Sequence, residues 1–522
     1  MKTTDIKSIN DLPTDVNQLK QLMWSLILDN RKLTDENILL RKEVFGKKSE
    51  KQTVADDCQL EMIELLSQIV PNVAPTQKDE YIDVKATKRR KNHPGRNAIP
   101  DSVETHEHLI DLPEDHKNCN NGCGPLKQIG EQKRTVIVRI PAKYERHIYI
   151  QPVYACNKCK DTPVAQEMPV VSPLPRIIPD INLLLFVILS KYQFHQPLYR
   201  IQRLIYHESQ IWFTRSTMVG WIAEICVPLK RIYNHLVSAV KNSFCIHSDD
   251  SKIKRCGHTS YMWPYVNGEQ TVAVFDYRET RSAAAPREFL KGVKPGTYLM
   301  TDCYSSYNDS VKKYQLIQMA CMMHVRREFI EAIETKYHIE YNRKILRFIR
   351  HLYRIERFAN EKGFSVEQRF DIRQRCSKVI LEQMKDSLMN PGITIVPQSR
   401  TAKAINYALG HWDRIIRFLE RGDLPIDNGI DERVIRDLAI GRKNWIQVMS
   451  DEGGKRMAIL YSIIATCKLN CINPEEYLKD ILMRMAIRPA EADVSDLTPV
   501  EWLKARNGGK LPEKKPLYPS VR

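Results

Sequence analysis

The segment 244–255, Phe-Cys-Ile-His-Ser-Asp-Asp-Ser-Lys-Ile-Lys-Arg, limits the possible folds of this chain more than any other stretch. Apolar Ile246 and Ile253 alternate with polar neighbours, which predicts a β-strand. Asp249 and Asp250 interrupt that strand, although aspartate is a poor strand former and a carboxylate is costly to bury unless it is paired or binds a metal ion. The segment is therefore either a strand end with a solvated turn or a strand that carries a metal site. The alternation does not choose between the two acids.

The sequence beyond this segment predicts a sheet of mixed direction. Two strand-like runs at 261–266 and 271–275 enclose Asn267-Gly268, a strong signal for a β-hairpin. The elements predicted next are, in order, a helix at 287–290, a strand at 296–302, a strand at 316–321 and a helix at 326–334. Strands joined first by a hairpin and then by helices are typical of an α/β fold.

Further acidic residues stand where a catalytic centre would need them. Asp302 ends a predicted strand, and Glu432 falls in the first turns of a helix predicted after the turn-forming segment 427–429. Carboxylates on neighbouring strands suit a phosphodiester chemistry in which two magnesium or manganese ions clamp the reacting oxygens. Asp276 and Asp309 are rival acids, for which a surface position is the simpler explanation.

Cations follow the third acid. Arg433 and Arg436 could neutralise phosphate or pair with Glu432 at helical spacing, and Arg442 and Lys443 add charge further along. In the whole chain Lys plus Arg number 80 and Asp plus Glu 63, which gives a formal charge of +17. This balance favours a polyanionic partner, nucleic acid first and an anionic membrane second.

Leucines recur every seven residues in the segment 16–44. Leu19, Leu26, Leu33 and Leu40 occupy the d positions of four heptads, and asparagine stands at two of the a positions. The pattern predicts a coiled coil through which the protein self-associates. The alternative is an amphipathic helix that packs within one chain.

The segment 85–96 contains six basic residues, no acid and a Pro-Gly pair that ends any helix. An extended basic segment suits contacts with DNA phosphates or a minor-groove arm, and a solvated linker is the alternative. The cations that we assign to DNA binding are Lys88, Arg89, Arg90, Lys91, Arg96, Arg433, Arg436, Arg442 and Lys443.

Two close pairs of cysteines, on turns between strand-like runs, predict a zinc ribbon. The thiolates of Cys119, Cys123, Cys156 and Cys159 would close a tetrahedral site around one structural zinc ion. Three residues separate the first pair, rather than the usual two. Unrelated reduced thiols are the alternative.

Helical sequence fills much of the remaining chain. Residues 213–222 resemble the second helix of a helix-turn-helix, with Thr214 or Ser216 as its cap, although a plain helical subdomain fits as well. Ser365 and Gln368 form a capping-box pattern within a long segment that we interpret as a helical insertion into the α/β domain.

Taken together, these motifs resemble those of the bacterial DDE transposases of insertion sequence family 66. The matching stretches are His247-Ser-Asp249-Asp-Ser, Thr301-Asp302-Cys-Tyr-Ser-Ser-Tyr307, Cys321-Met-Met-His324-Val-Arg-Arg327, Asp427-Asn-Gly-Ile-Asp-Glu432-Arg-Val-Ile-Arg436 and Gly441-Arg-Lys-Asn-Trp445. The zipper, the basic segment and the zinc ribbon occur in the same order in that family, so the resemblance runs from about residue 16 to 485. Asp250 stands where the family usually has Glu, Ser251 where it usually has Thr, and Cys303 where Gly is common.

The resemblance implies a ribonuclease H-like catalytic fold that cleaves and joins DNA strands. It implies that Asp249, Asp302 and Glu432 are the catalytic, metal-binding acids, and it thereby selects Asp249 over Asp250. The implied partners are transposon ends and target DNA, with possible accessory proteins of the same element. Two other functions stay open: a metal-dependent nuclease of the same fold, and a DNA-binding regulator with a decayed catalytic core.

We therefore predict a multidomain α/β protein with a ribonuclease H-like catalytic core and a helical insertion, preceded by a coiled coil and a zinc ribbon. The predicted domains are a coiled coil at 14–50, a helix and basic linker at 51–100, a zinc ribbon at 101–170, a helical and possibly DNA-binding subdomain at 171–240, a catalytic domain at 241–455 with its insertion at about 335–425, a C-terminal helical element at 456–490 and a disordered basic tail at 491–522. No apolar run is long enough to span a membrane, and the N-terminus lacks an apolar signal region. We expect a bacterial cytoplasmic, nucleoid-associated protein.

Overall fold

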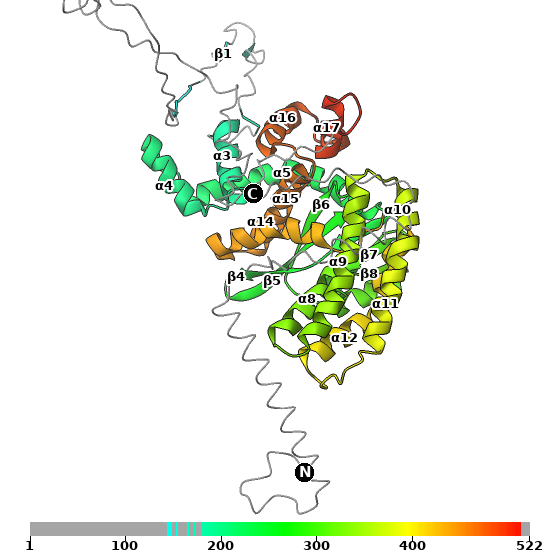
Figure 1. Ribbon diagram of the computed structural model, residues 1–522. Coiled ribbons are helices and arrows are strands. Elements are labelled where there is room, and N and C mark those ends of the chain that lie inside the picture. The colour runs from blue at the N-terminus through cyan, green and yellow to red at the C-terminus, as the bar shows by residue number, and fades with distance from the viewer. Residues whose placement is uncertain (1–142, 149–152, 155–163, 166–171, 174–178, 513–522) are drawn as a thin grey trace, which may run out of the picture. The chain divides into compact units, whose positions relative to one another are not determined.

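The structure is a computed structural model that describes residues 143–148, 153–154, 164–165, 172–173 and 179–512 (Figure 1). The predicted coiled coil, the basic linker and the four cysteines of the predicted zinc ribbon lie outside the described residues. Strands β1 (Val153–Tyr154) and β2 (Val164–Ala165) pair antiparallel on either side of the second cysteine pair in the sequence. None of the described helices has both the length and the apolar character needed to cross a membrane.

A seven-stranded mixed sheet forms the core. Its strands are β3 (Cys245–Ser248), β4 (Ser251–Arg255), β5 (His258–Asn267), β6 (Ala273–Arg278), β7 (Tyr298–Thr301), β8 (Ile317–Ala320) and β9 (Gln447–Val448). The order is β8-β7-β3-β5-β4-β9, and β6 pairs with β5. β3, β7 and β8 are parallel to one another, whereas β5 is antiparallel to β3, β4 and β6. The predicted β5–β6 hairpin is confirmed.

The predicted single strand at 244–255 is divided into β3 and β4 by Asp249 and Asp250. Both halves pair with β5 in one continuous register, which places Asp249 opposite Pro264. Phe275, the partner of Pro264 on β6, directs its own N–H and C=O to side chains of neighbouring helices, so the polar backbone edge of Pro264 faces Asp249. Because proline has no N–H, the ladder loses a hydrogen bond there and the chain leaves the sheet at the two acids.

Two long helices pack on β6. They are α5 (Arg215–Lys241) and α15 (Asp451–Leu469). On α15, the Ser462 hydroxyl accepts a hydrogen bond from the Phe275 N–H at 2.8 Å, and the Thr466 hydroxyl accepts one from the Ala273 N–H at 3.1 Å. The C-terminal element predicted to start at 456 therefore begins inside a helix that belongs to the core.

Thr214 caps α5, as predicted, by accepting a hydrogen bond from the Thr217 N–H at 3.1 Å. The residues that resemble a recognition helix are the first turns of this long helix. Its buried side includes Trp221, Ile225 and Leu229, which join the main core. The preceding helices are α3 (Ile181–Tyr192) and α4 (Leu198–Ser209).

Short helices connect β6, β7 and β8. Longer helices form a bundle in the part of the chain between β8 and α14 (Figure 1). The short connections are α6 (Ala284–Phe289), a 3-10 turn at Ser305–Tyr307 and α7 (Asn308–Tyr314). The bundle comprises α8 (Met322–Glu334), α9 (Ile339–Glu361), α10 (Val366–Ile372), α11 (Lys378–Met389), α12 (Arg400–Gly410) and α13 (Trp412–Ile415). The capping box predicted from Ser365 and Gln368 is present at the start of α10.

Arg373 holds this bundle to the chain that leads back to the sheet. Its side chain is 1% exposed, and it pairs with Glu356 of α9 through two contacts of 2.8 Å. It also donates to three backbone carbonyls in the segment 418–424, which precedes α14 (Gly429–Trp445). The buried charge is thus paired and fully hydrogen bonded, as burial requires.

The prediction of a disordered tail from 491 is wrong for residues 495–506. A 3-10 turn at Ser495–Leu497 and α17 (Pro499–Arg506) follow α16 (Pro474–Ile487). Trp502 is 4% exposed, and its Nε1–H donates to Asp480 of α16 at 2.7 Å. The prediction relied on the basic composition of the tail and overlooked Trp502, whose burial supplies enough apolar surface to order a short helix.

Candidate active site

Asp249 and Asp302 lie at the same level on two adjacent parallel strands. His247 of β3 is paired with Met300 of β7, and the same register continued by two residues sets Asp249 beside Asp302. Each acid directly follows the last residue of its strand. Neighbouring parallel strands end at the same edge of a sheet, so both acids lie at that edge. Adjacent strands are about 4.8 Å apart, so the two carboxylates share one small region.

Glu432 reaches this region from the first turn of α14, which packs against β3, β4 and β5. Asn428, immediately before the helix, is fully buried and ties it to β3. Its side-chain amide donates to the Ser248 carbonyl at 3.1 Å, and its side-chain oxygen lies 3.0 Å from Nδ1 of His247. The backbone N–H of Asn428 is 3.2 Å from Sγ of Cys321. These bonds fix the start of α14 beside the end of β3.

The three acids repel one another. Burial, together with the charges of Asp302, Asp250 and Glu432, raises the pKa of Asp249 to about 7. Asp302 is oriented by its own turn, since its Oδ1 accepts a hydrogen bond from the Tyr304 N–H at 2.9 Å. A cation placed among these groups would relieve the repulsion that Asp249 experiences.

Counter-charges distinguish Asp249 from Asp250. The guanidinium of Arg281 holds Asp250 at 2.6 Å and stacks on the ring of Tyr304, with 3.8 Å from Cζ to the ring centroid. Asp249 forms no ion pair with any residue that the structure describes. Glu432 is paired with Arg327 at 2.9 Å. Asp250 is therefore already neutralised within the protein, and Asp249 is not.

Two buried groups beside these acids were not predicted as part of the site. Asp431 is fully buried, and burial followed by the charge of Asp249 raises its pKa well above the usual range. Burial lowers the pKa of His247 to about 4, so this histidine is neutral. Proximity in sequence is the one signal that could have identified them, since Asp431 directly precedes Glu432 and His247 stands two residues before Asp249.

Cys303 has a φ of 64°, in the left-handed region that glycine adopts without cost. It follows Asp302 directly, where the chain must turn sharply out of β7. This requirement explains why glycine is common at the position in the resembled family. The cysteine side chain leaves the turn in place but strains it.

The cations predicted on α14 have different environments. Arg433, Arg436 and Lys443 are exposed. Arg442 instead donates to the Ser251 hydroxyl at 2.8 Å and to the Lys252 carbonyl at 2.6 Å, which gives it a structural role that the sequence did not predict. The five cations of the basic segment lie outside the described residues, as do Cys119, Cys123, Cys156 and Cys159.

The rival acids are engaged elsewhere. Asp276 pairs with Arg278 at 2.7 Å, and Asp309 pairs with Arg287 at 3.3 Å. Asp309 is exposed, as expected. The expectation of a surface position is wrong for Asp276, whose side chain is only 16% exposed and whose charge is instead paired with Arg278.

The donor chemistry of the site suits a hard divalent cation, since the charges of Asp302 and Glu432 act on Asp249 and help to raise its pKa. Within the described part of the chain, however, no three His, Cys, Asp or Glu side chains are already arranged to hold a metal ion. Glu432 is paired with Arg327 through Oε1, which occupies one of its two carboxylate oxygens. Metal binding through that oxygen would therefore require Glu432 to exchange that partner.

Fold and side chains together define the class: a mixed α/β protein with an acidic centre where its parallel strands end. Comparison with known families agrees with this class over more than half of the chain. The Transposase IS66 family model matches residues 176–456, and the chain belongs to the IS66 transposase family. Further family models match the IS66 C-terminal element at 462–500, the zinc-finger binding domain of transposase IS66 at 116–160 and the Transposase C of IS166 homeodomain at 32–106.

Curated relatives come from Sinorhizobium fredii (strain NBRC 101917 / NGR234). The uncharacterized protein y4hP is 25% identical over 494 residues, which cover 89% of this chain and 88% of the relative. The uncharacterized protein y4jD is 28% identical over 502 residues, which cover 91% of this chain and 93% of the relative. The similarity thus extends over nearly the whole length of both relatives.

Proposed function

We propose that this protein is a DDE transposase that cleaves DNA at the ends of its insertion sequence and joins them to a target. The observation that carries the proposal is the shared level of Asp249 and Asp302 on β3 and β7. In support of it, the start of α14 is hydrogen bonded to β3, and the charge of Glu432 on that helix helps to raise the pKa of Asp249. The family supports the transposase role. We further propose that the sheet and its helices form a ribonuclease H-like core.

The roles of the side chains follow from their environments. Asp249 and Asp302 would hold two magnesium or manganese ions, and Glu432 would complete the coordination of one of them. When bound, such ions activate a water or 3′-hydroxyl nucleophile and stabilise the leaving oxygen. Arg327 keeps Glu432 paired in the metal-free protein. Arg281 neutralises Asp250, so that the charge available for a cation is that of Asp249.

The remaining proposals concern the segments around the core. One structural zinc ion would be held by the four cysteines within the matched zinc-finger domain. The basic segment, together with Arg433, Arg436 and Lys443, would contact transposon ends and target DNA. The N-terminal heptads would mediate self-association in a cytoplasmic, nucleoid-associated protein, and accessory proteins of the same element could take part.

Strand cleavage and joining on a duplex that carries the element's own end tests the proposal. With magnesium, the wild-type protein should nick the end and join it to a second duplex. Asp249→Asn, Asp302→Asn and Glu432→Gln should each lower the rate at least about 100-fold, because each removes several kcal/mol of metal-mediated stabilisation. Asp309→Asn, a surface carboxylate paired with Arg287, is the matched control and should retain full activity.

The same assay separates the alternatives. Cleaved but never joined products would identify a nuclease of the same fold. A wild-type protein that binds the end without cutting it would identify a regulator with a decayed core. Full activity in Asp249→Asn or Glu432→Gln would contradict the proposed mechanism.

A further inference from the structure

One face of α9 carries a continuous stripe of arginines. Arg343, Arg347, Arg350, Arg354 and Arg357 follow one another at intervals of four, three, four and three residues. This spacing keeps all five on one side of an α-helix. With a rise of 1.5 Å per residue, the stripe is about 20 Å long. We call these five residues the arginine stripe.

The stripe faces solvent, because the opposite side of α9 is buried in the bundle through Ile345, Ile349 and Leu352. Arg343, Arg347 and Arg357 are exposed, and the other two arginines are half-buried. The positive charges thus remain accessible along the whole length of the helix.

Few acids neutralise the arginine stripe. Glu340 pairs with Arg343 at 2.6 Å, whereas Glu356 is committed to the buried Arg373. Arg347, Arg350 and Arg357 form no ion pair with any residue described by the structure. An ordinary solvated helix face intersperses charges of both signs, so three arginines in one row without an acidic partner among the described residues indicate an anionic partner.

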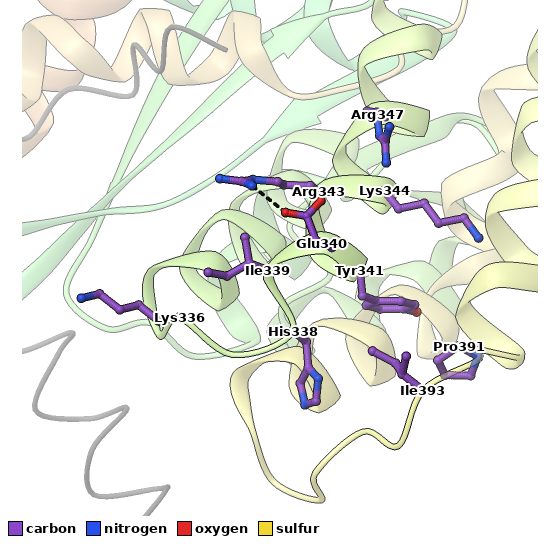
Figure 2. Close-up of a pocket in the computed structure, with 10 residues that line it drawn as sticks. All are labelled: Lys336, His338, Ile339, Glu340, Tyr341, Arg343, Lys344, Arg347, Pro391 and Ile393. Atoms are coloured by element: carbon purple, nitrogen blue, oxygen red, sulfur yellow. Dashed lines mark hydrogen bonds and ion pairs between the residues drawn. The ribbon is translucent and has the colours of Figure 1, made fainter. Parts of the chain in front are cut away.

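The two ends of α9 have different surroundings. At the N-terminal end, a hollow of about 720 Å³ is lined in part by Lys336, Arg343, Lys344 and Arg347. Figure 2 draws these side chains. Toward the C-terminal end, the hydroxyl of Tyr353 donates to Asp427 at 2.6 Å, immediately before α14. Tyr353 therefore joins the C-terminal half of α9 to the segment that leads into α14, the helix that carries Glu432, while the N-terminal end of the arginine stripe borders a basic hollow.

We propose that the arginine stripe binds the sugar-phosphate backbone of the DNA duplex that enters the acidic centre. The proposal rests on the proposed function, since it takes DNA as the substrate. Arginine donates two parallel hydrogen bonds to a phosphate, and a 20 Å row spans about six base pairs of a duplex that rises about 3.4 Å per pair. Because such contacts reach phosphates only, this surface positions DNA without reading its sequence.

The test is the salt dependence of binding to a random-sequence duplex, measured by fluorescence anisotropy on the full chain without divalent metal. The logarithm of the binding constant K falls linearly with the logarithm of the salt concentration. Replacing Arg347, Arg350 and Arg357 by Gln should reduce the magnitude of that slope by about 2.7, or 0.9 per lost phosphate contact. Between 50 and 200 mM salt, the wild-type protein should consequently lose about 40-fold more affinity than the triple variant.

Matched controls distinguish the effect of where the charges lie from the effect of how many charges are removed. The variant Lys294→Gln/Lys312→Gln/Lys313→Gln removes the same three charges from exposed sites outside α9 and should keep the wild-type slope. Replacing the three arginines by Lys should also keep most of the slope. The single variant Arg347→Gln removes an exposed side chain with no ion pair to a described residue, so it should fold normally and lower the slope by about 0.9.

An unchanged slope in Arg347→Gln and in the triple variant would overturn the proposal, as would an equal loss in the lysine control. Cleavage is not needed for this measurement. A failure of binding at the stripe is therefore distinguishable from a failure of the proposed catalytic function, which the acid-to-amide variants test.

Discussion

At the scale of single residues, two neighbouring aspartates have opposite environments. Asp250 is bound by Arg281, whereas Asp249 forms no ion pair with a described residue and lies beside Asp302. The strand pattern could not distinguish them, because both stand at the same interruption of the alternation. The position of one arginine, 31 residues away in the sequence, makes the difference.

The raised pKa of Asp249 predicts a pH-dependent stability in the metal-free protein. Its folded-state pKa of about 7 exceeds the ordinary value of 3.8, so the folded protein binds the proton of Asp249 more tightly than the unfolded chain does. The resulting stabilisation of the folded state is complete below about pH 4 and is lost as the pH rises through about 7. Asp249→Asn cannot ionise and should be the more stable protein at pH 8, by about 2 kcal/mol once partial solvent screening is allowed for. Thermal unfolding at pH 4 and pH 8 measures this, and an equal difference at both values would contradict it.

The left-handed backbone at Cys303 makes a second residue-scale prediction. Cys303→Gly should be more stable than Cys303→Ala by about 1 kcal/mol, because glycine lacks a Cβ and adopts a φ of 64° without a clash. Both variants lack the thiol, so the comparison isolates the backbone. Chemical unfolding of the pair measures the difference, and equal stabilities would show that the turn is not strained.

At the scale of elements, the site depends on how α14 is joined to β3. An asparagine at a helix start usually caps its own helix, yet the Asn428 side chain bonds to Ser248 and His247 of the strand instead. The helix entrance thereby holds Glu432 at a fixed level relative to Asp249. Arg442 reinforces the junction from the other end of the helix by bonding to β4.

Removing this junction should affect activity more than stability alone explains. Asn428→Ala should lower the unfolding free energy by about 2 kcal/mol, because it leaves buried polar groups of β3 without partners. It should also lower the cleavage rate at temperatures where the protein remains folded. Asn473→Ala, which removes the side-chain cap of α16, is the control and should cost about 1 kcal/mol while leaving cleavage unchanged. Unchanged cleavage in Asn428→Ala would show that the junction does not position Glu432.

At the scale of the whole molecule, the sequence predicted the mixed sheet and its hairpin because their signals are local. The break at Asp249 and Asp250 depends on Pro264 in the opposing strand, and no local pattern shows which residues will face each other. The order of the tail was also missed, since it rests on the burial of Trp502 against a distant helix. The three candidate acids could be proposed from the family resemblance, whereas their counter-ions, Arg281 and Arg327, required the fold.

The central claim is that Asp249, Asp302 and Glu432 together form one divalent-metal site, and manganese binding followed by electron paramagnetic resonance tests it most directly. The wild-type protein should bind Mn²⁺, and magnesium should compete for the same site. Asp249→Asn, Asp302→Asn and Glu432→Gln should each weaken Mn²⁺ binding at least about tenfold, whereas Asp309→Asn should leave it unchanged. Wild-type Mn²⁺ affinity in any one of the three site variants would contradict the account.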